Sequence, residues 1–278
     1  MRDILHFSHA NGFPVSTYRK LFALLEDDFE IRAVDRYGHD PKFPVTREWP
    51  HLVDELLASL ERNYREPVWL VGHSLGGFLS LMAALQRPQW VRGVVMLDSP
   101  VIAGWRAALL KAGQRFGLDE RPGPAAVTRR RRTHWPDAEA VWQHFRAKPV
   151  FAAWDEEVLR DYAMHGTEPT GNDAERRLRF EREIEYRIYR TLPTSLGSRV
   201  ARGAPVPVGF VAGTRSREVR QCGLGATRKL VGERLRFIEG GHLYPMERPG
   251  QTATLIGELI DAMRTDLPAA RNGSTVIA

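Results

Sequence analysis

Hydrophobic and polar residues follow two alternating periods along the first hundred residues. Short, nearly continuous apolar runs are typical of strands buried on both faces, and they occur at 4–10, 29–38, 67–73 and 91–99. Leucines and aromatic residues recur at helical spacing in the segments between them, at 16–28, 49–63 and 74–88. This alternation predicts an α/β fold with a mostly parallel central sheet flanked by helices.

The pattern changes after Pro100. Helical periodicity without strand-like apolar runs continues to about residue 202, with candidate helices at 104–117, 137–148 and 174–192. Strand and helix patterns then resume at 205–214, 219–232, 235–242 and 251–267. We therefore predict a core domain formed by residues 1–100 and 203–278, with a helical cap domain inserted at 101–202. We expect the tail at 268–278 to fray.

The composition is that of an ordinary globular protein, with 43% hydrophobic and 27% charged residues. The single cysteine, Cys222, excludes an intrachain disulfide framework. The N-terminal segment has none of the features of a secretion signal, and no apolar segment reaches the ~20 residues needed to cross a bilayer. We expect a cytoplasmic protein.

The net charge of +6 could favour an anionic partner. Only five of the 40 basic residues are lysines, and the arginines alternate with acids, as in residues 176–190, which is typical of solvated helix faces. The dense run from Arg129 to Arg132 indicates an exposed loop or helix start. We expect a small-molecule substrate as the partner, without nucleic acid or membrane, and the sequence leaves the oligomeric state open.

The strongest chemical signal is Gly72-His73-Ser74-Leu75-Gly76, a G-x-S-x-G motif between a predicted strand and a predicted helix. Such a turn holds the serine in a strained conformation at a helix N-terminus, where main-chain N–H groups stabilise negative charge. The motif predicts Ser74 as a nucleophile.

With this motif in this position, the chain resembles the α/β-hydrolase family, in particular serine esterases with a helical cap. Residues 9–14, His-Ala-Asn-Gly-Phe-Pro, are similar to the family's oxyanion loop, and residues 35–39 are similar to a structural turn. The resemblance implies an oxyanion hole formed by the main-chain N–H groups of Phe13 and Leu75. Each donor of this kind contributes about 3 kcal/mol to lowering a barrier.

A serine nucleophile needs a histidine as general base. Gly240-Gly241-His242, followed by Glu247 and Pro249, resembles the family's terminal histidine loop, which implies His242 as the base. The other histidines lack this context, and no histidine spacing indicates a metal site. His73, beside the nucleophile, is expected to pack within the turn.

The acid that orients the histidine departs from the family pattern. The usual position, three residues after Gly213, holds Ser216. Two acids are available as substitutes: Asp98 at the end of the strand at 91–99, which we favour slightly, and Glu218, two residues beyond the vacant position. Either preserves the chain order of serine, acid and histidine.

These residues predict a serine hydrolase that cleaves a carboxylic ester of a small, largely apolar substrate, without cofactor or metal. Alternatively, the substrate carries a carboxylate, which arginines of the predicted cap could bind. The same fold also supports carbon–carbon bond hydrolysis, lyase and cofactor-free haloperoxidase reactions. A weakly catalytic ligand-binding protein is a further alternative, since the usual acid is missing.

Overall fold

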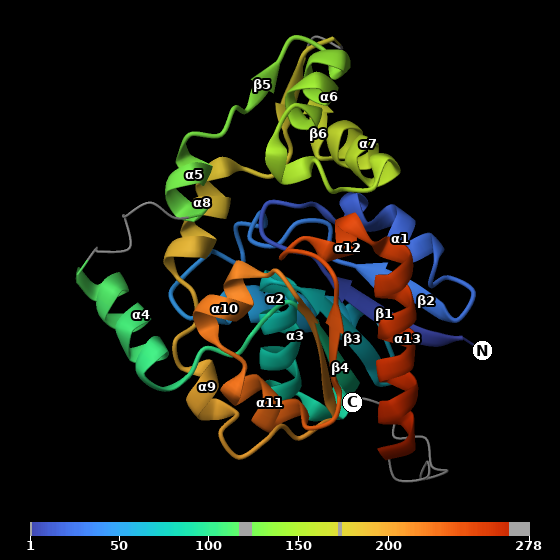
Figure 1. Ribbon diagram of the computed structural model, residues 1–278, viewed down its shortest axis with the longest axis vertical. Coiled ribbons are helices and arrows are strands. Elements are labelled where there is room, and N and C mark those ends of the chain that lie inside the picture. Colours follow the sequence, from blue (N-terminus) through green and yellow to red (C-terminus); the bar gives the residue numbers. More distant parts are fainter. Residues whose placement is uncertain (1, 117–123, 172–173, 267–278) are drawn as a thin grey trace.

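Six parallel strands form the centre of the molecule, in the order β2-β1-β3-β4-β8-β9 (Figure 1). They are β1 Asp3–Ser8, β2 Phe29–Ala33, β3 Val68–His73, β4 Val91–Leu97, β8 Val208–Gly213 and β9 Leu235–Ile238. The computed structural model describes residues 2–116, 124–171 and 174–266. The α/β fold predicted from the sequence is confirmed, and this sheet is wholly parallel.

Both faces of the sheet are covered because side chains along each central strand alternate between two hydrophobic clusters. In β3, Val68 and Leu70 belong to the cluster that contains α2 and α3, whereas Trp69 and Val71 belong to the cluster that contains α1 and α13. The principal flanking helices are α1 Arg19–Ala23, α2 Pro50–Asn63, α3 Leu75–Gln86, α11 Gly225–Val231 and α13 Pro249–Asp266. The apolar runs of these strands therefore reflect burial on both sides.

Shorter helices join these elements. They are η1 Val15–Tyr18, η2 Pro88–Trp90, α10 Arg217–Cys222 and α12 Tyr244–Glu247. The helical stretch predicted at 219–232 is interrupted, because Gly223 has a φ of 70° and ends α10 before α11 begins. The predicted frayed tail lies outside the described residues.

The segment between β4 and β8 lies partly above the carboxyl edge of the sheet and partly beside the core (Figure 1). Its helices are α4 Gly104–Phe116, α5 Pro124–Arg129, α6 Ala138–Arg146, η4 Pro149–Phe151, α7 Glu156–His165, α8 Arg182–Arg190 and α9 Leu196–Arg199. It also contains an antiparallel sheet of β5 His134–Trp135, β7 Arg176–Leu178 and β6 Thr167–Pro169. The segment predicted to be helical therefore also contains a small antiparallel sheet.

The helix predicted at 174–192 is the clearest difference. Its first part forms β7, in which Leu178 is buried and Arg177 is exposed, and helix α8 begins only at Arg182. The alternation of arginine with Leu178 and Phe180 has a period of two, which favours a strand over a helix.

The loops that follow the central strands meet at the carboxyl edge of the sheet. Residues 9–14 follow β1, Ser74 follows β3, Asp98 follows β4 and His242 follows β9. Open parallel sheets bind ligands at this edge, near the point where the strand order reverses, which in this sheet lies between β1 and β3. No helix within the described ranges is long and apolar enough to span a membrane.

Helix α3 approaches β1 so closely that only glycine fits at Gly76. A methyl group there would lie 1.9 Å from the carbonyl oxygen of Ser8. We expect Gly76→Ala to lower the free energy of unfolding by more than about 2 kcal/mol, measured by urea denaturation, because backbone must move to relieve the overlap.

Gly257→Ala is the matched control, since Gly257 lies within α13 and a methyl group there would contact nothing within 4 Å. This change is expected to stabilise the protein by up to about 1 kcal/mol through helix propensity. Equal stabilities of the two variants would contradict the close packing of α3 on β1.

Candidate functional site

Ser74 lies at the turn from β3 to α3 in a strained backbone conformation. Its φ of 52° and ψ of −114° lie outside the regions that residues other than glycine favour. Its main-chain N–H donates to the carbonyl of Leu97 at 2.9 Å, which ties the turn to the end of β4. A methyl group on Gly72 would lie 2.2 Å from the carbonyl carbon of Gly76, so the turn requires glycine. The tight turn predicted at 72–76 is present.

His242 contacts Ser74 and Asp98 with its two ring nitrogens. Nε2 lies 2.9 Å from Oγ of Ser74, and Nδ1 lies 2.7 Å from Oδ2 of Asp98. Because an ionised carboxylate only accepts hydrogen bonds, Nδ1 carries the proton and Nε2 accepts from the Ser74 hydroxyl. An imidazole held in this way can take the serine proton during attack on an electrophile.

The carboxylate of Asp98 is buried and accepts three hydrogen bonds. Oδ1 accepts from the main-chain N–H of Gly213 at 2.8 Å, and Oδ2 accepts from the Ser216 hydroxyl at 2.5 Å as well as from His242. Ser216 occupies the position where the family usually has its acid. Its hydroxyl therefore supports a carboxylate that comes from the neighbouring strand end.

Glu218, the alternative acid, lies farther away. Its Oε2 is 3.6 Å from Nδ1 of His242, beyond hydrogen-bond distance, and its side chain is 38% exposed. Burial lowers the pKa of His242, but the hydrogen bond to Asp98 and the negative charges of Glu218 and Asp98 outweigh burial and raise this pKa above its ordinary value. The site therefore contains one hydrogen-bonded acid and one nearby charge.

Asp98, Glu218 and His242 also have the residue types of a metal site. Their potential ligand atoms lie within 4.8 Å of one another, the one such group of three or more found among the described residues. Nδ1 of His242 already hydrogen-bonds the Asp98 oxygen that Ser216 holds. The grouping of these three residues is therefore explained by the role of Asp98 in orienting His242.

The two predicted oxyanion donors differ in geometry. Leu75 is the first residue of α3, and an N–H in the first turn of a helix has no intrahelical partner. The N–H of Phe13 donates to the carbonyl of Ala10 at 3.1 Å, across a turn in which Gly12 has a φ of 82°. The N–H of Leu75 is therefore free of an intrahelical partner and could donate to an oxyanion as it stands. Phe13 would have to redirect its N–H from Ala10 or share it.

A buried hydrogen-bond chain, not foreseen from the sequence, joins the loop after β1 to the histidine loop. The N–H of Ala10 donates to the Tyr18 hydroxyl at 3.1 Å, and that hydroxyl lies 2.8 Å from Nδ1 of His73. Nε2 of His73 lies 2.9 Å from the carbonyl oxygen of His242. Burial lowers the pKa of His73 well below its ordinary value, so the ring is neutral and can donate at one nitrogen and accept at the other.

His9 performs a similar structural role on the other side of the same loop. Its Nδ1 lies 2.8 Å from the carbonyl oxygen of Ala10, and its Nε2 accepts from the N–H of Tyr37 at 3.0 Å. Burial lowers the pKa of His9 to about 4, which keeps the ring neutral. The loop at 9–14 is thereby fixed to the turn at 35–39, which we predicted to be structural.

The segment between β4 and β8 contacts this loop beside an ion pair that is largely shielded from solvent. Arg131 donates to Glu185 at 2.6 Å and to the Tyr162 hydroxyl at 2.5 Å. A methyl group on Gly12 would lie 2.8 Å from the Glu185 carboxyl carbon, and Asn11 donates to the main-chain oxygen of Glu185 at 3.0 Å. The run at 129–132 is therefore not wholly exposed, because the side chain of Arg131 is only 15% exposed in its pair with Glu185.

The sequence comparisons give partial matches. The chain is 29% identical over 115 residues to a monoglyceride lipase from Rattus norvegicus. The match covers 38% of this chain and 38% of the lipase, so it leaves most of each protein unmatched.

Solved structures match over nearly the whole chain. The structure of an E-2-(acetamidomethylene)succinate hydrolase aligns with a TM-score of 0.75 and 25% identity, covering 94% of this chain and 91% of that protein. The peroxisomal α/β-hydrolase Lpx1 from Saccharomyces cerevisiae has a TM-score of 0.75 at 16% identity, covering 100% of this chain and 81% of that protein, which supports the fold alone. The model of the alpha/beta hydrolase family matches residues 7–255, and the chain belongs to this family, whose members are hydrolases.

Proposed function

We propose that this protein is a serine hydrolase that cleaves a carboxylic ester of a small, largely apolar substrate through an acyl-enzyme on Ser74. The observation that carries the proposal is the continuous contact from Oγ of Ser74 through His242 to Asp98, with distances of 2.9 and 2.7 Å. These groups lie at the carboxyl edge of the sheet, where open parallel sheets bind their ligands.

In the proposed reaction, Oγ of Ser74 attacks the ester carbonyl carbon while Nε2 of His242 takes the hydroxyl proton. Asp98 keeps the proton on Nδ1 and stabilises the imidazolium that forms. The carbon–oxygen bond to the alcohol then breaks, and the alcohol leaves with the proton from Nε2. Water, deprotonated by Nε2, attacks the acyl carbon, and the acid departs as Ser74 regains its proton. The N–H of Leu75, joined by that of Phe13 once it turns from Ala10, stabilises the oxyanion.

The surroundings favour an apolar acyl or alcohol group. The ring of Phe13 lies 5.7 Å from Trp154 and 5.3 Å from Tyr162, so aromatic cap side chains cover the loop that carries the proposed oxyanion donor. Apolar pockets with a few polar groups are typical of small-molecule sites. The partial match to a monoglyceride lipase, whose name specifies an ester of glycerol, agrees with this substrate class.

The charge balance favours a neutral substrate over a carboxylate. Arg131 is the arginine that lies against Gly12, where its Nη1 would be 3.2 Å from a methyl group. Its charge is already taken up by Glu185. A substrate carboxylate would have to displace that acid, which costs more than binding to a free guanidinium.

The first test is hydrolysis of p-nitrophenyl esters, from acetate to long acyl chains, by the wild-type protein and by Ser74→Ala. We expect turnover by the wild-type protein and a loss of at least about 10³-fold in kcat for the variant, since the nucleophile is removed. Ser99→Ala is the control, because Ser99 lies beside the same turn but donates only to main-chain oxygens of Ser74 and Leu97.

Equal rates for wild type and Ser74→Ala would contradict the acyl-enzyme. Absence of turnover by the wild type on every ester would shift weight to carbon–carbon bond hydrolysis, to lyase or haloperoxidase chemistry, or to ligand binding alone.

The second test separates the two acids. Asp98→Asn is expected to lower kcat by roughly 10²–10⁴-fold, because the amide no longer enforces the histidine tautomer. Glu218→Gln is expected to leave the maximal kcat nearly unchanged but to lower the pKa of His242 by removing a nearby negative charge. Since the base works only when neutral, the acidic limb of the kcat/KM profile should move to lower pH.

The control for this test is Glu258→Gln, which removes an exposed charge from α13. Its pH profile should match the wild type. A larger loss of kcat in Glu218→Gln than in Asp98→Asn would contradict the assignment of Asp98 as the orienting acid.

A further inference from the structure

Helix α4 carries three large apolar side chains on the outside of the molecule. Trp105, Leu109 and Phe116 are 67%, 65% and 69% exposed. Their spacings of four and seven residues place them on one stripe of the helix, with Ala112 between them. In Figure 1, α4 stands at the margin of the molecule, away from the central sheet. Soluble proteins rarely expose a stripe of this kind without a partner.

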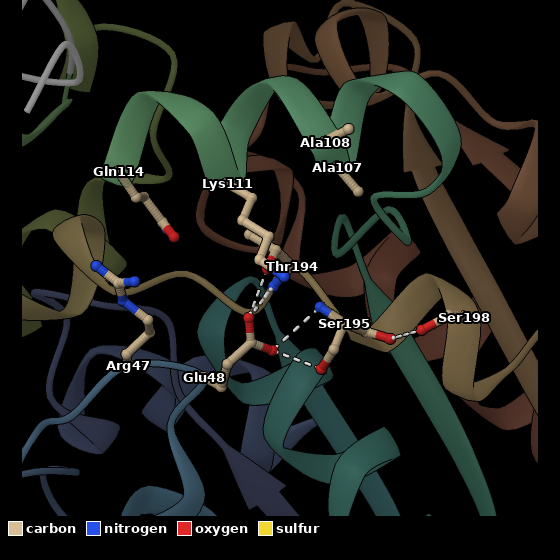
Figure 2. A pocket seen from close by; sticks show the side chains of 9 residues that line it. All are labelled: Arg47, Glu48, Ala107, Ala108, Lys111, Gln114, Thr194, Ser195 and Ser198. Atoms are coloured by element: carbon tan, nitrogen blue, oxygen red, sulfur yellow. Dashed lines mark hydrogen bonds between the residues drawn. The ribbon is translucent and has the colours of Figure 1, made fainter. Parts of the chain in front are cut away.

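The side of α4 that faces the protein is mostly small or polar, and Leu110 is the one large apolar residue there, half-buried. Ala107, Ala108, Lys111 and Gln114 line a cavity of about 440 Å³ beneath the helix, opposite Glu48 and Ser195 (Figure 2). Gln114 donates to the main-chain oxygen of Leu192 at 3.0 Å. Glu48 is the acid among the residues that line this cavity, and its carboxylate accepts hydrogen bonds from Thr194 and Ser195.

This orientation is the reverse of that in an ordinary surface helix, which turns its apolar stripe toward the core. Burial of the helix within its own chain therefore does not explain why Trp105, Leu109 and Phe116 are present.

The charge of α4 indicates what covers the stripe. The helix contains Arg106, Lys111 and Arg115 and no acidic residue, and the Arg106 guanidinium stacks on the Trp105 ring at 4.6 Å. A second copy packed against the stripe would bring the cations of both helices together without acids on the helices to pair with them. Anionic lipid headgroups supply the opposite charge beside an apolar layer.

We propose that α4 docks the protein on the surface of an anionic lipid bilayer. Trp105, Leu109 and Phe116 insert at the level of the headgroups, and Arg106 and Arg115 bind the phosphates. The helix lies in the plane of the surface and does not cross it, consistent with the absence of a spanning helix in the described residues. This binding is independent of Ser74 and is an alternative to the expectation from the sequence that no membrane is involved.

The test is co-sedimentation of the purified full chain with vesicles of phosphatidylcholine, alone or mixed with an equal amount of phosphatidylglycerol. We expect the wild-type protein to bind the anionic vesicles, with weaker binding as salt is added. The triple variant Trp105→Gln, Leu109→Gln, Phe116→Gln should lose at least about tenfold in partition coefficient, because it removes the inserted side chains. Replacing Arg106 and Arg115 with Gln should also weaken binding.

The control variant is Leu24→Gln, Phe237→Gln, which changes two side chains that are each 49% exposed elsewhere. It should bind as the wild type does, and thermal melting should show that every variant is folded. Ser74→Ala should bind like the wild type even if no ester is hydrolysed, which separates this proposal from the proposed function. Failure of the wild type to bind, or equal binding by the triple variant, would overturn the proposal. Dimers that sedimentation velocity detects in the wild type but not in the triple variant, without vesicle binding, would instead assign the stripe to a second copy.

Discussion

The geometry of the site depends on a close approach of backbone to backbone at the start of α3. Gly72 and Gly76 allow the chain to turn within van der Waals distance of itself and of Ser8, and the strain is stored at Ser74, whose φ is 52°. Strain of this kind persists only where surrounding contacts fix it. Here the hydrogen bond from Ser74 to Leu97 and the packing of α3 on β1 provide those contacts, and the hydroxyl is presented at a helix N-terminus.

The other parts of the site come from different strand ends and are joined by buried hydrogen bonds. One connection runs from Gly213 and Ser216 through Asp98 to His242. Another runs from Ala10 through Tyr18 and His73 to the main chain of His242. Because unpaired polar groups are costly when buried, each connection fixes the relative positions of its loops. The candidate oxyanion loop and the histidine are therefore held by one network even though they are far apart in the sequence.

Much of the site could be predicted because its two main loops are encoded by short stretches of sequence. The strand and helix around Ser74 and the glycine-rich loop before His242 have recognisable patterns, and the structure brings these two residues together. The choice between the two acids depends on their distances from Nδ1 of His242, which are 2.7 Å for Asp98 and 3.6 Å for Glu218. Sequence spacing does not determine these distances. The serine at position 216, where the family pattern has an acid, was a usable signal for Asp98, since its hydroxyl can support an acid from the adjacent strand.

The cap was predicted less well, because its elements depend on contacts between segments. Strand β7 forms by pairing with β5 and β6 on either side, and helical spacing in 174–192 concealed the shorter alternation at Arg177, Leu178 and Phe180. The periodicity of α4 was read correctly, but periodicity gives the existence of an apolar stripe and not the direction in which it faces. The buried position of Arg131 likewise depends on Glu185, which lies 54 residues away.

We infer that the strained turn and His242 make the hydroxyl of Ser74 reactive toward electrophiles. The most direct measurement is treatment of the folded protein with a fluorophosphonate, followed by digestion and mass spectrometry to locate the adduct. We predict a single adduct on Ser74, absent after prior unfolding in urea because the activation depends on the folded arrangement. An adduct on another residue, or none on the folded protein, would contradict the account.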